Sequence, residues 1–341
     1  MKKITINSKT ISSNSPTYII AEIGSNHNND YNIALEMIDK AKSAGVDAIK
    51  FQSFKAETHY SRYTPGHSNY KKKLYDLIKD LEMNHNWMRK IKNYCDELDI
   101  DVFSSPCDYK SVDEMIELRT GALKVASFDL TDVKLIEYMA KSDLAILLST
   151  GMATMGDIEN AVNACKKSTN NFALLQCTSL YPAPPRLSNL NAIKTMQLAF
   201  DCLVGYSDHT LGDHIAISAV SMGAKIIEKH YTLDREMGGP DHSFAIEPSE
   251  LKIMVQRIRD VEDSFGDGLK NGARVEETEN HSLRRSLIAS SDIKKGETLT
   301  ENNVTIKRPG YGISPIDYDI VIGRLATTNI KEDEWITWNM I

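Results

Sequence analysis

The sequence predicts an α/β protein in which a (β/α)₈ barrel, or TIM barrel, is followed by a small β-rich domain. Eight short runs rich in aliphatic and β-branched residues recur between residues 17 and 230, which indicates strands. Between them, apolar residues recur at three- and four-residue spacing, which indicates helices. After about residue 266 this alternation stops. A barrel takes about 250 residues, so the 341-residue chain leaves room for one further small domain.

The predicted strands are short and apolar, and each is bounded by polar or turn-forming residues. They are 17–24, 47–52, 100–105, 122–127, 144–150, 172–178, 202–207 and 224–230. Segments such as 31–45 and 85–99 have the apolar spacing of helices that cover such a sheet. A doubly wound open sheet is the alternative. Eight regular units, and no G-x-G-x-x-G after the first strand, favour the barrel.

The change of pattern near residue 266 sets the predicted domain limits. We predict a barrel domain over 1–266, a linker over 267–282 and a β-rich domain over 283–341. The linker is polar and contains glycine, and the last segment has short strands and turn pairs such as KKGE. Because this last domain is too short to build a large core, we expect it to pack against another surface.

Composition excludes several classes of function. The formal net charge of −7 argues against a nucleic-acid-binding surface. No apolar run approaches the roughly 20 residues that a membrane span needs, and the two lysines at the start precede no signal-peptide core. The five cysteines are scattered, without a disulfide framework or a CxxC pair. We therefore expect a cytoplasmic protein with reduced cysteines.

Active sites of such barrels form where the strands end, at the C-terminal face. Polar side chains follow or close every predicted strand: Glu22, Asn26 and His27; Lys50 and Gln52; Ser104 and Ser105; Lys124, Ser127 and Asp129; Ser149 and Thr150; Thr178 to Tyr181; Ser207, Asp208 and His209; Glu228 and His230. We expect these side chains to converge on one site.

Two lysines within apolar strands are the strongest sign of a site. Burying an unpaired charge is costly, so Lys50 and Lys124 need a purpose or a partner. With the neighbouring hydroxyls they could bind a phosphate or a carboxylate. Single residues have structural alternatives. The serines and Thr150 could be strand-end or capping groups, Glu22 a salt-bridge partner of a lysine, and Asp208 the cap of a helix.

The segment GYSDHT (205–210) places a serine, an aspartate and a histidine side by side. A hydrolase triad is not expected there, because consecutive residues of a strand point to opposite sides. His209 and His230 instead end neighbouring strands, so that both could bind one divalent metal ion. Water or substrate would fill the remaining positions, as in catalytic sites. The alternative is two unrelated histidines.

Nine segments of the barrel and the tail together carry a family resemblance. They are IAEIGSNHNND (20–30), AIKFQ (48–52), FSSP (103–106), LKVASFD (123–129), LLSTGM (147–152), QCTSLYPAP (176–184), GYSDHT (205–210), IEKHYTLD (227–234) and GGPDHSFAIEPSEL (238–251). In this order they resemble the sialic acid (nonulosonic acid) synthases. The tail, from SLIASSDIKKGETLTENNVTIKRPG onward, resembles the antifreeze-like (SAF) domain of that family, so the resemblance covers essentially the whole chain.

The resemblance implies a metal-dependent condensation. The C3 atom of phosphoenolpyruvate would attack the aldehyde of an open-chain N-acetylmannosamine-type sugar. Water would add at C2, and inorganic phosphate would leave. The implied metal is Mn²⁺, with Mg²⁺ or Co²⁺ as alternatives, and the implied assembly is a domain-swapped homodimer.

The resemblance also assigns roles by position. His209 and His230 match the metal ligands, and Glu22 matches an acidic residue beside metal and sugar. The matches for phosphoenolpyruvate binding are Lys50, Ser105, Lys124, Ser127, Ser149 and Thr150. The matches for sugar binding are Gln52, Asp129, Tyr181, Asp241 and, reaching into the partner subunit, Arg308.

The exact sugar is left open by conflicting motifs. ASFD (126–129) is similar to pseudaminate synthases and spore-coat polysaccharide enzymes, whereas GGPDHS (238–243) is similar to neuraminate and legionaminate synthases. N-acetylneuraminate synthase is the first candidate. The alternatives are a legionaminate, pseudaminate or spore-coat synthase, a keto-deoxy-octulosonate-phosphate-type synthase, a non-catalytic sugar-binding protein and a metal-dependent hydrolase.

Overall fold

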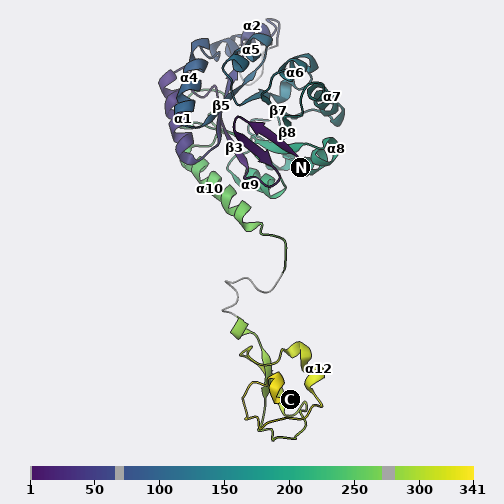
Figure 1. Cartoon of the computed structure of the whole chain (residues 1–341). Coiled ribbons are helices and arrows are strands. Elements are labelled where there is room, and N and C mark those ends of the chain that lie inside the picture. Colours follow the sequence, from purple (N-terminus) through teal and green to yellow (C-terminus); the bar gives the residue numbers. More distant parts are fainter. Residues whose placement is uncertain (1, 66–72, 271–280) are drawn as a thin grey trace. The chain divides into compact units, whose positions relative to one another are not determined.

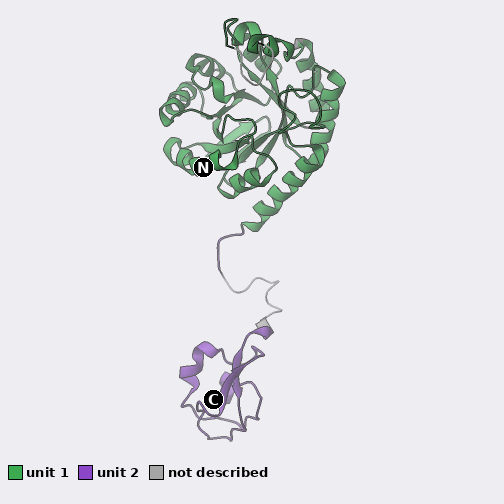
Figure 2. Ribbon diagram, turned by 180° about the vertical axis from the view of Figure 1, so that it is seen from behind, with its two compact units in different colours: residues 1–265 green, residues 266–341 purple. Residues whose placement is uncertain are grey.

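The computed structural model describes residues 2–65, 73–270 and 281–341. The chain forms two compact units, Met1–Phe265 and Gly266–Ile341, each built on its own hydrophobic core (Figure 2). None of the helices in the described ranges has the length and apolar composition that crossing a membrane requires.

The first unit is a closed parallel barrel, which confirms the predicted fold (Figure 1). Each of the eight predicted strands overlaps one barrel strand. Neighbours around the barrel follow chain order, and the last strand pairs with the first. The strands are β3 (Tyr18–Gly24), β4 (Ala48–Ser53), β5 (Asp101–Pro106), β6 (Ala122–Val125), β7 (Ala145–Ser149), β8 (Phe172–Cys177), β9 (Leu203–Asp208) and β10 (Ile226–His230).

Helices form the outer ring of the barrel (Figure 1). The first begins after Asp30, whose side chain accepts hydrogen bonds from two backbone N–H groups, and ends at Gly45 with φ of 88°. The helices are α1 (Tyr31–Ala44), α2 (Ala56–His59), α3 (Leu74–Asp80), α4 (His85–Glu97), α5 (Tyr109–Glu117), α6 (Val133–Met139), α7 (Met155–Lys166), α8 (Asn191–Phe200), α9 (His214–Ser221) and α10 (Pro248–Ser264).

Alternation along each strand separates two cores. In β3, Ile19, Ala21 and Ile23 belong to the core between strands and helices. Tyr18 and Ile20 point the other way, into the barrel interior. The interior is therefore apolar toward the N-terminal ends of the strands, and the polar positions lie farther along, toward the C-terminal ends.

An antiparallel hairpin that the sequence reading did not predict packs on this interior. It consists of β1 (Lys3–Ile6) and β2 (Lys9–Ser12), paired with Ile4 opposite Ile11. Three hairpin side chains join the interior cluster: Ile4, Ile6 and Ile11. The hairpin thus covers the N-terminal end of the barrel, the end opposite the predicted site.

The second unit has a small core around a two-stranded antiparallel sheet. The strands are β11 (Ser286–Ala289) and β12 (Val304–Lys307), and a short helix, α12 (Tyr318–Val321), packs nearby. This agrees with the predicted β-rich domain. Most of the predicted linker, residues 271–280, lies outside the described residues.

Gly205, in β9, lies at a tightly packed position of the barrel interior. A Cβ atom there would lie 2.4 Å from the carbonyl oxygen of Ile226 and 2.6 Å from Leu175 Cδ2. Gly205→Ala should therefore destabilise the first unit by about 1–3 kcal/mol, measured as a lower urea midpoint. Gly156→Ala is the control, because a Cβ in α7 meets only Thr154 Oγ1 at 3.8 Å. Equal midpoints for Gly205→Ala and the unmodified chain would contradict this packing.

Candidate active site

A cavity of about 320 Å³ lies at the C-terminal ends of the barrel strands. Every strand contributes at least one lining side chain: Glu22, Lys50, Gln52, Ser105, Lys124, Ser149, Cys177, Ser207, Glu228 and His230. Most of the polar strand-end residues that the sequence indicates therefore lie together, as is typical of this fold. Asn26, His27, Ser104, Thr150 and Asp208 are not among the lining residues.

Strand register brings the charged residues together. Glu22 pairs with His230 of β10 on one side and with Lys50 of β4 on the other. These positions alternate along each strand with residues that face the helices. If one strand shifted by one residue against its neighbours, its charged side chains would point into the core between strands and helices. The closed barrel thus fixes a row of inward polar groups across neighbouring strands.

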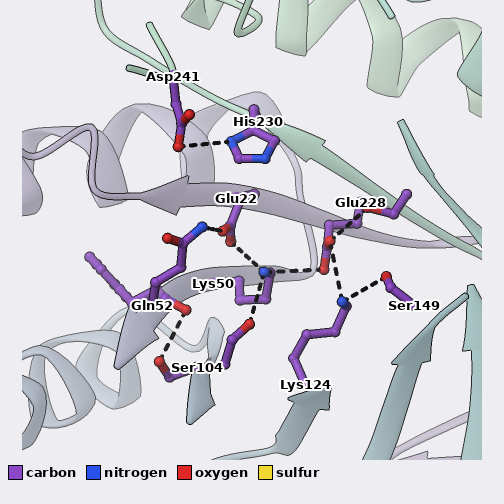
Figure 3. Close-up of polar contacts among 12 residues, drawn as sticks. Glu22, Lys50, Gln52, Ser104, Lys124, Ser149, Glu228, His230 and Asp241 are labelled. Carbon is purple, nitrogen blue, oxygen red and sulfur yellow. Dashed lines mark hydrogen bonds and ion pairs between the residues drawn. The ribbon is translucent and has the colours of Figure 1, made fainter. Parts of the chain in front are cut away.

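Four buried charges form one connected chain (Figure 3). Lys50 Nζ lies 3.0 Å from Glu22 Oε2 and 3.6 Å from Glu228 Oε2. Lys124 Nζ lies 3.8 Å from the other oxygen of Glu228. Each of the four residues is at most 4% exposed. Charges buried this deeply persist only when paired, and here two ammonium groups balance two carboxylates.

The pKa values of Glu22, Glu228 and Lys124 shift in different directions. Burial raises the pKa of Glu22 to about 7, against the opposing effect of Lys50. Burial also favours a higher pKa for Glu228, but Lys124 and Lys50 outweigh it and the net shift is downward. Burial lowers the pKa of Lys124. Near neutral pH, therefore, Glu228 holds a charge while Glu22 is poised to exchange a proton.

Hydroxyl groups hold both lysines in place. Lys50 Nζ donates to Ser105 Oγ at 3.2 Å, and Lys124 Nζ donates to Ser149 Oγ at 2.7 Å. Ser127, which also lines the cavity, shares a hydrogen bond of 2.9 Å with Ser179. Two ammonium groups surrounded by hydroxyls suit a small anion that carries phosphate and carboxylate oxygens.

His209 and His230 are neighbours whose ring centroids lie 5.5 Å apart. His209 Nδ1 donates to the carbonyl of Thr178 at 2.7 Å, so the lone pair is at Nε2. Among the described residues, the buried His230 Nδ1 finds no hydrogen-bond partner, and it lies 4.0 Å from Asp241 Oδ2. Burial lowers the pKa of His209 to about 4 and that of His230 well below its usual value. Two neutral imidazoles, one with an orphaned buried nitrogen, fit a divalent metal.

The predicted sugar-binding residues of the barrel also line the cavity: Gln52, Asp129, Tyr181 and Asp241. Gln52 donates to Glu22 at 2.8 Å. The Tyr181 ring stacks on His209 with centroids 4.3 Å apart. Burial raises the pKa of Asp241 to about 6. Tyr181 and Asp241 thus lie beside the histidine pair, whereas Gln52 contacts Glu22 and Asp129 lies near Cys107.

Two residues with predicted roles lie elsewhere. Thr150 is not among the lining residues, and its hydroxyl donates to the carbonyl of Leu175 in β8. Arg308 belongs to the second unit, where its Nε donates to the carbonyl of Leu283. His27, weighed as a strand-end residue, is buried outside the cavity with Nδ1 accepting from Asn29 N.

Glu228 is the residue to which sequence reasoning gave no role. It contacts both lysines and accepts a hydrogen bond from Ser207 at 2.9 Å. The sequence did contain a sign of its role: Glu228 precedes His230 by two residues, so both side chains lie on the inner face of β10.

Asp208 does not cap a helix, since the residue before α9 is Asp213. Its carboxylate accepts from Thr210 and pairs with Lys229 at 2.7 Å, and both side chains of the ion pair are at most 2% exposed. Each member precedes a histidine of the pair in the chain. The Asp208–Lys229 bond, on the outer face of β9 and β10, therefore fixes the backbone from which both imidazoles project.

Comparison with known proteins agrees with this geometry. The profile described as the NeuB family matches residues 37–270, and the profile described as the SAF domain matches residues 284–341. The chain is 42% identical to N,N'-diacetyllegionaminic acid synthase of Campylobacter jejuni, covering 94% of this chain and 98% of that one. It is 35% identical to the enzyme of the same name from Legionella pneumophila, with coverages of 95% and 94%.

A solved structure is similar over most of the chain. The crystal structure of N-acetylneuraminic acid (sialic acid) synthetase from Leptospira borgpetersenii superposes with a TM-score of 0.75 at 36% identity. The match covers 83% of this chain and 96% of that one.

Asp208→Asn should destabilise the barrel by about 3–5 kcal/mol, because it leaves the Lys229 ammonium buried without a carboxylate. The double variant Asp208→Asn/Lys229→Met should recover most of this loss. Urea unfolding midpoints provide the measurement. Asp213→Asn, which breaks the surface pair with Arg257, is the matched control and should change little. If the double variant is no more stable than the single one, the pairing argument is wrong.

Proposed function

Because the chain belongs to the NeuB family, we propose that it condenses phosphoenolpyruvate with an N-acylated amino sugar, giving a nine-carbon nonulosonate and inorganic phosphate. The observation that carries the proposal is the buried chain of Lys50, Glu22, Glu228 and Lys124 beside a pair of neutral histidines. The cavity thus contains a cationic binding site for a small anion, next to a site that can polarise a carbonyl group.

Phosphoenolpyruvate binds, in this proposal, at the two lysines and their hydroxyls. Lys50 and Lys124 neutralise its phosphate and carboxylate, and Ser105, Ser127 and Ser149 donate hydrogen bonds to the same oxygens. Glu228 bridges the two ammonium groups and orients them before the anion binds.

Glu22 is the group placed to move a proton. The aldehyde oxygen gains a proton as C3 of phosphoenolpyruvate joins the aldehyde carbon, and the water that adds at C2 loses one before the C2–O bond to phosphate breaks. A carboxyl group with a pKa near 7 serves either transfer at neutral pH. Gln52 and Lys50 fix its orientation. A divalent ion held by His209 and His230, with Mn²⁺ as our first choice and Mg²⁺ or Co²⁺ as alternatives, would supply Lewis acidity toward the aldehyde.

The acceptor sugar enters at the open end, against Gln52, Asp129, Tyr181 and Asp241. N-acetylmannosamine, leading to N-acetylneuraminate, is one candidate. A hexose with two N-acyl groups is the second, and it is favoured by the similarity to two N,N'-diacetyllegionaminic acid synthases. Several apolar side chains line the cavity and suit a second acyl group; we call them the apolar wall: Tyr60, Leu74, Leu77, Ile78, Leu81 and Phe128.

Arg308 extends the proposal to a homodimer. The side chain is exposed in the second unit, and the only role we assign to it is contact with the sugar in the partner subunit's cavity. A monomer with full activity would contradict this part of the proposal and leave the barrel chemistry intact.

Phosphate release provides the main test. It should require phosphoenolpyruvate, a divalent metal and an N-acylated amino sugar together, and it should not occur with arabinose 5-phosphate as the acceptor. His230→Ala should lower kcat/KM by about a hundredfold or more, since Lewis-acid stabilisation amounts to several kcal/mol. His214→Ala, an exposed histidine at the start of α9, is the control. Turnover that persists in His230→Ala at wild-type rate would exclude the assigned ligand.

Phe128 should influence the choice of acceptor. Its side chain is 59% exposed at the cavity and supplies apolar surface to the wall. Phe128→Ala should lower kcat/KM for a doubly N-acylated sugar about tenfold more than for N-acetylmannosamine, because an apolar contact of this size is worth about 1–3 kcal/mol. Leu198→Ala, at an exposed apolar residue of α8 that does not line the cavity, should leave the ratio unchanged. An unchanged ratio in Phe128→Ala would remove it from acceptor recognition.

A further inference from the structure

Three potential metal ligands meet at the sugar end of the cavity, apart from the histidine pair. They are His59 at the end of α2, Cys107 just after β5, and Asp129 at the end of a 3₁₀ turn, Ser127–Asp129. Their ligand atoms all lie within 4.8 Å of one another. In the described parts of the chain this is the single set of three such side chains, and neither His209 nor His230 belongs to it.

The spacing of the three groups is close to that of a tetrahedral site. Zinc bonds of about 2.0–2.3 Å place ligand atoms roughly 3.3–3.8 Å apart. Cys107 Sγ already lies 3.8 Å from Asp129 Oδ2. Because no pair of ligand atoms is farther apart than 4.8 Å, a shift of at most about 1 Å closes the set. The three side chains are half-buried rather than locked in the core.

A hydrogen bond next to the cluster supports its geometry. Thr58 Oγ1 donates to Asp108 Oδ2 at 2.6 Å. These two residues adjoin His59 and Cys107 in the chain, so the bond ties α2 to the end of β5. The two segments that carry the imidazole and the thiol are thereby linked.

The chemistry of the set selects a class of ion. A thiolate with an imidazole and a carboxylate favours Zn²⁺ and similar borderline ions over Mg²⁺, which prefers oxygen. Burial and the nearby Asp129 raise the pKa of Cys107, so the free group is a thiol. Metal binding releases that proton and turns the thiol into a thiolate ligand.

We propose that His59, Cys107 and Asp129 form a second cation site, which takes Zn²⁺ or an ion of its class with water in the fourth position. The site is distinct from the His209–His230 pair and shares no residue with it. Because Asp129 is also assigned to the sugar, an ion bound here competes with the acceptor but not with phosphoenolpyruvate. Only this competition rests on the proposed function; binding of the ion does not.

Co²⁺ binding to the full chain, freed of metal with a chelator, tests the site directly. A cysteine ligand should produce thiolate-to-cobalt charge-transfer absorption in the near ultraviolet, which histidine and carboxylate ligands do not give. Added Zn²⁺ should remove the band by displacing Co²⁺. Absence of the band in the unmodified chain would overturn the proposal.

Two variants and a control assign the band. Cys107→Ser should abolish it, whereas Cys177→Ser, which alters another cysteine of the same cavity, should keep it. His59→Ala should weaken Co²⁺ binding by about tenfold or more. Circular dichroism and thermal melting establish that each variant is folded. A band that survives Cys107→Ser, or is lost only in Cys177→Ser, would contradict the assignment.

Kinetics then separates this site from the proposed reaction. With Mn²⁺ in excess, Zn²⁺ should raise the apparent KM for the sugar and leave that for phosphoenolpyruvate unchanged, and Cys107→Ser should abolish the effect. Equal inhibition of Cys107→Ser would exclude competition at this site. If the chain binds Co²⁺ through Cys107 but releases no phosphate, the proposed function fails and the cation site stands. If the chain turns over but shows no charge-transfer band, the proposed function stands and the cation site fails.

Discussion

The contact of Glu228 with two lysines is the constraint on which the site depends. Without this carboxylate, Lys50 and Lys124 would share the barrel interior with Glu22 alone, and one ammonium group would lack a counter-charge. Glu228 takes its place from the register of β10, which also sets Glu22 beside His230. The charges of the interior are therefore balanced only when β10 pairs in this register, because a different register would move Glu228 away from the two lysines.

The eight strands and most of the site could be predicted because each signal is local. A strand shows itself by composition, and side chains two apart share a face, so the polar strand ends had to converge once the barrel closed. The hairpin of β1 and β2 was missed although Ile4 and Ile6 alternate correctly, because a two-stranded hairpin gains stability only from the surface it covers. That surface exists only in the folded barrel.

What the sequence could not supply were relations between distant residues. The pairing of Asp208 with Lys229 needed the register of β9 against β10, and a helix cap was the simpler local interpretation. The approach of His59 to Cys107 and Asp129 joins three segments that have no common motif. Thr150 shows the converse: its position beside Ser149 suggested the site, but strand alternation turns its hydroxyl toward the backbone of β8.

The hairpin at the N-terminal end of the barrel bears on how ligands reach the cavity. Among the described residues, Ile4, Ile6 and Ile11 cover that end with apolar side chains, whereas the cavity lies at the C-terminal ends of the strands. A ligand seated on the buried lysines lies deeper than one that touches Tyr181 and Phe128 at the exposed end. If the proposed function holds, we expect the ligand on the lysines to bind before the one at the exposed end, because the outer ligand would stand in its path. The hairpin would then contribute to catalysis without touching a substrate, by setting the order in which two substrates bind.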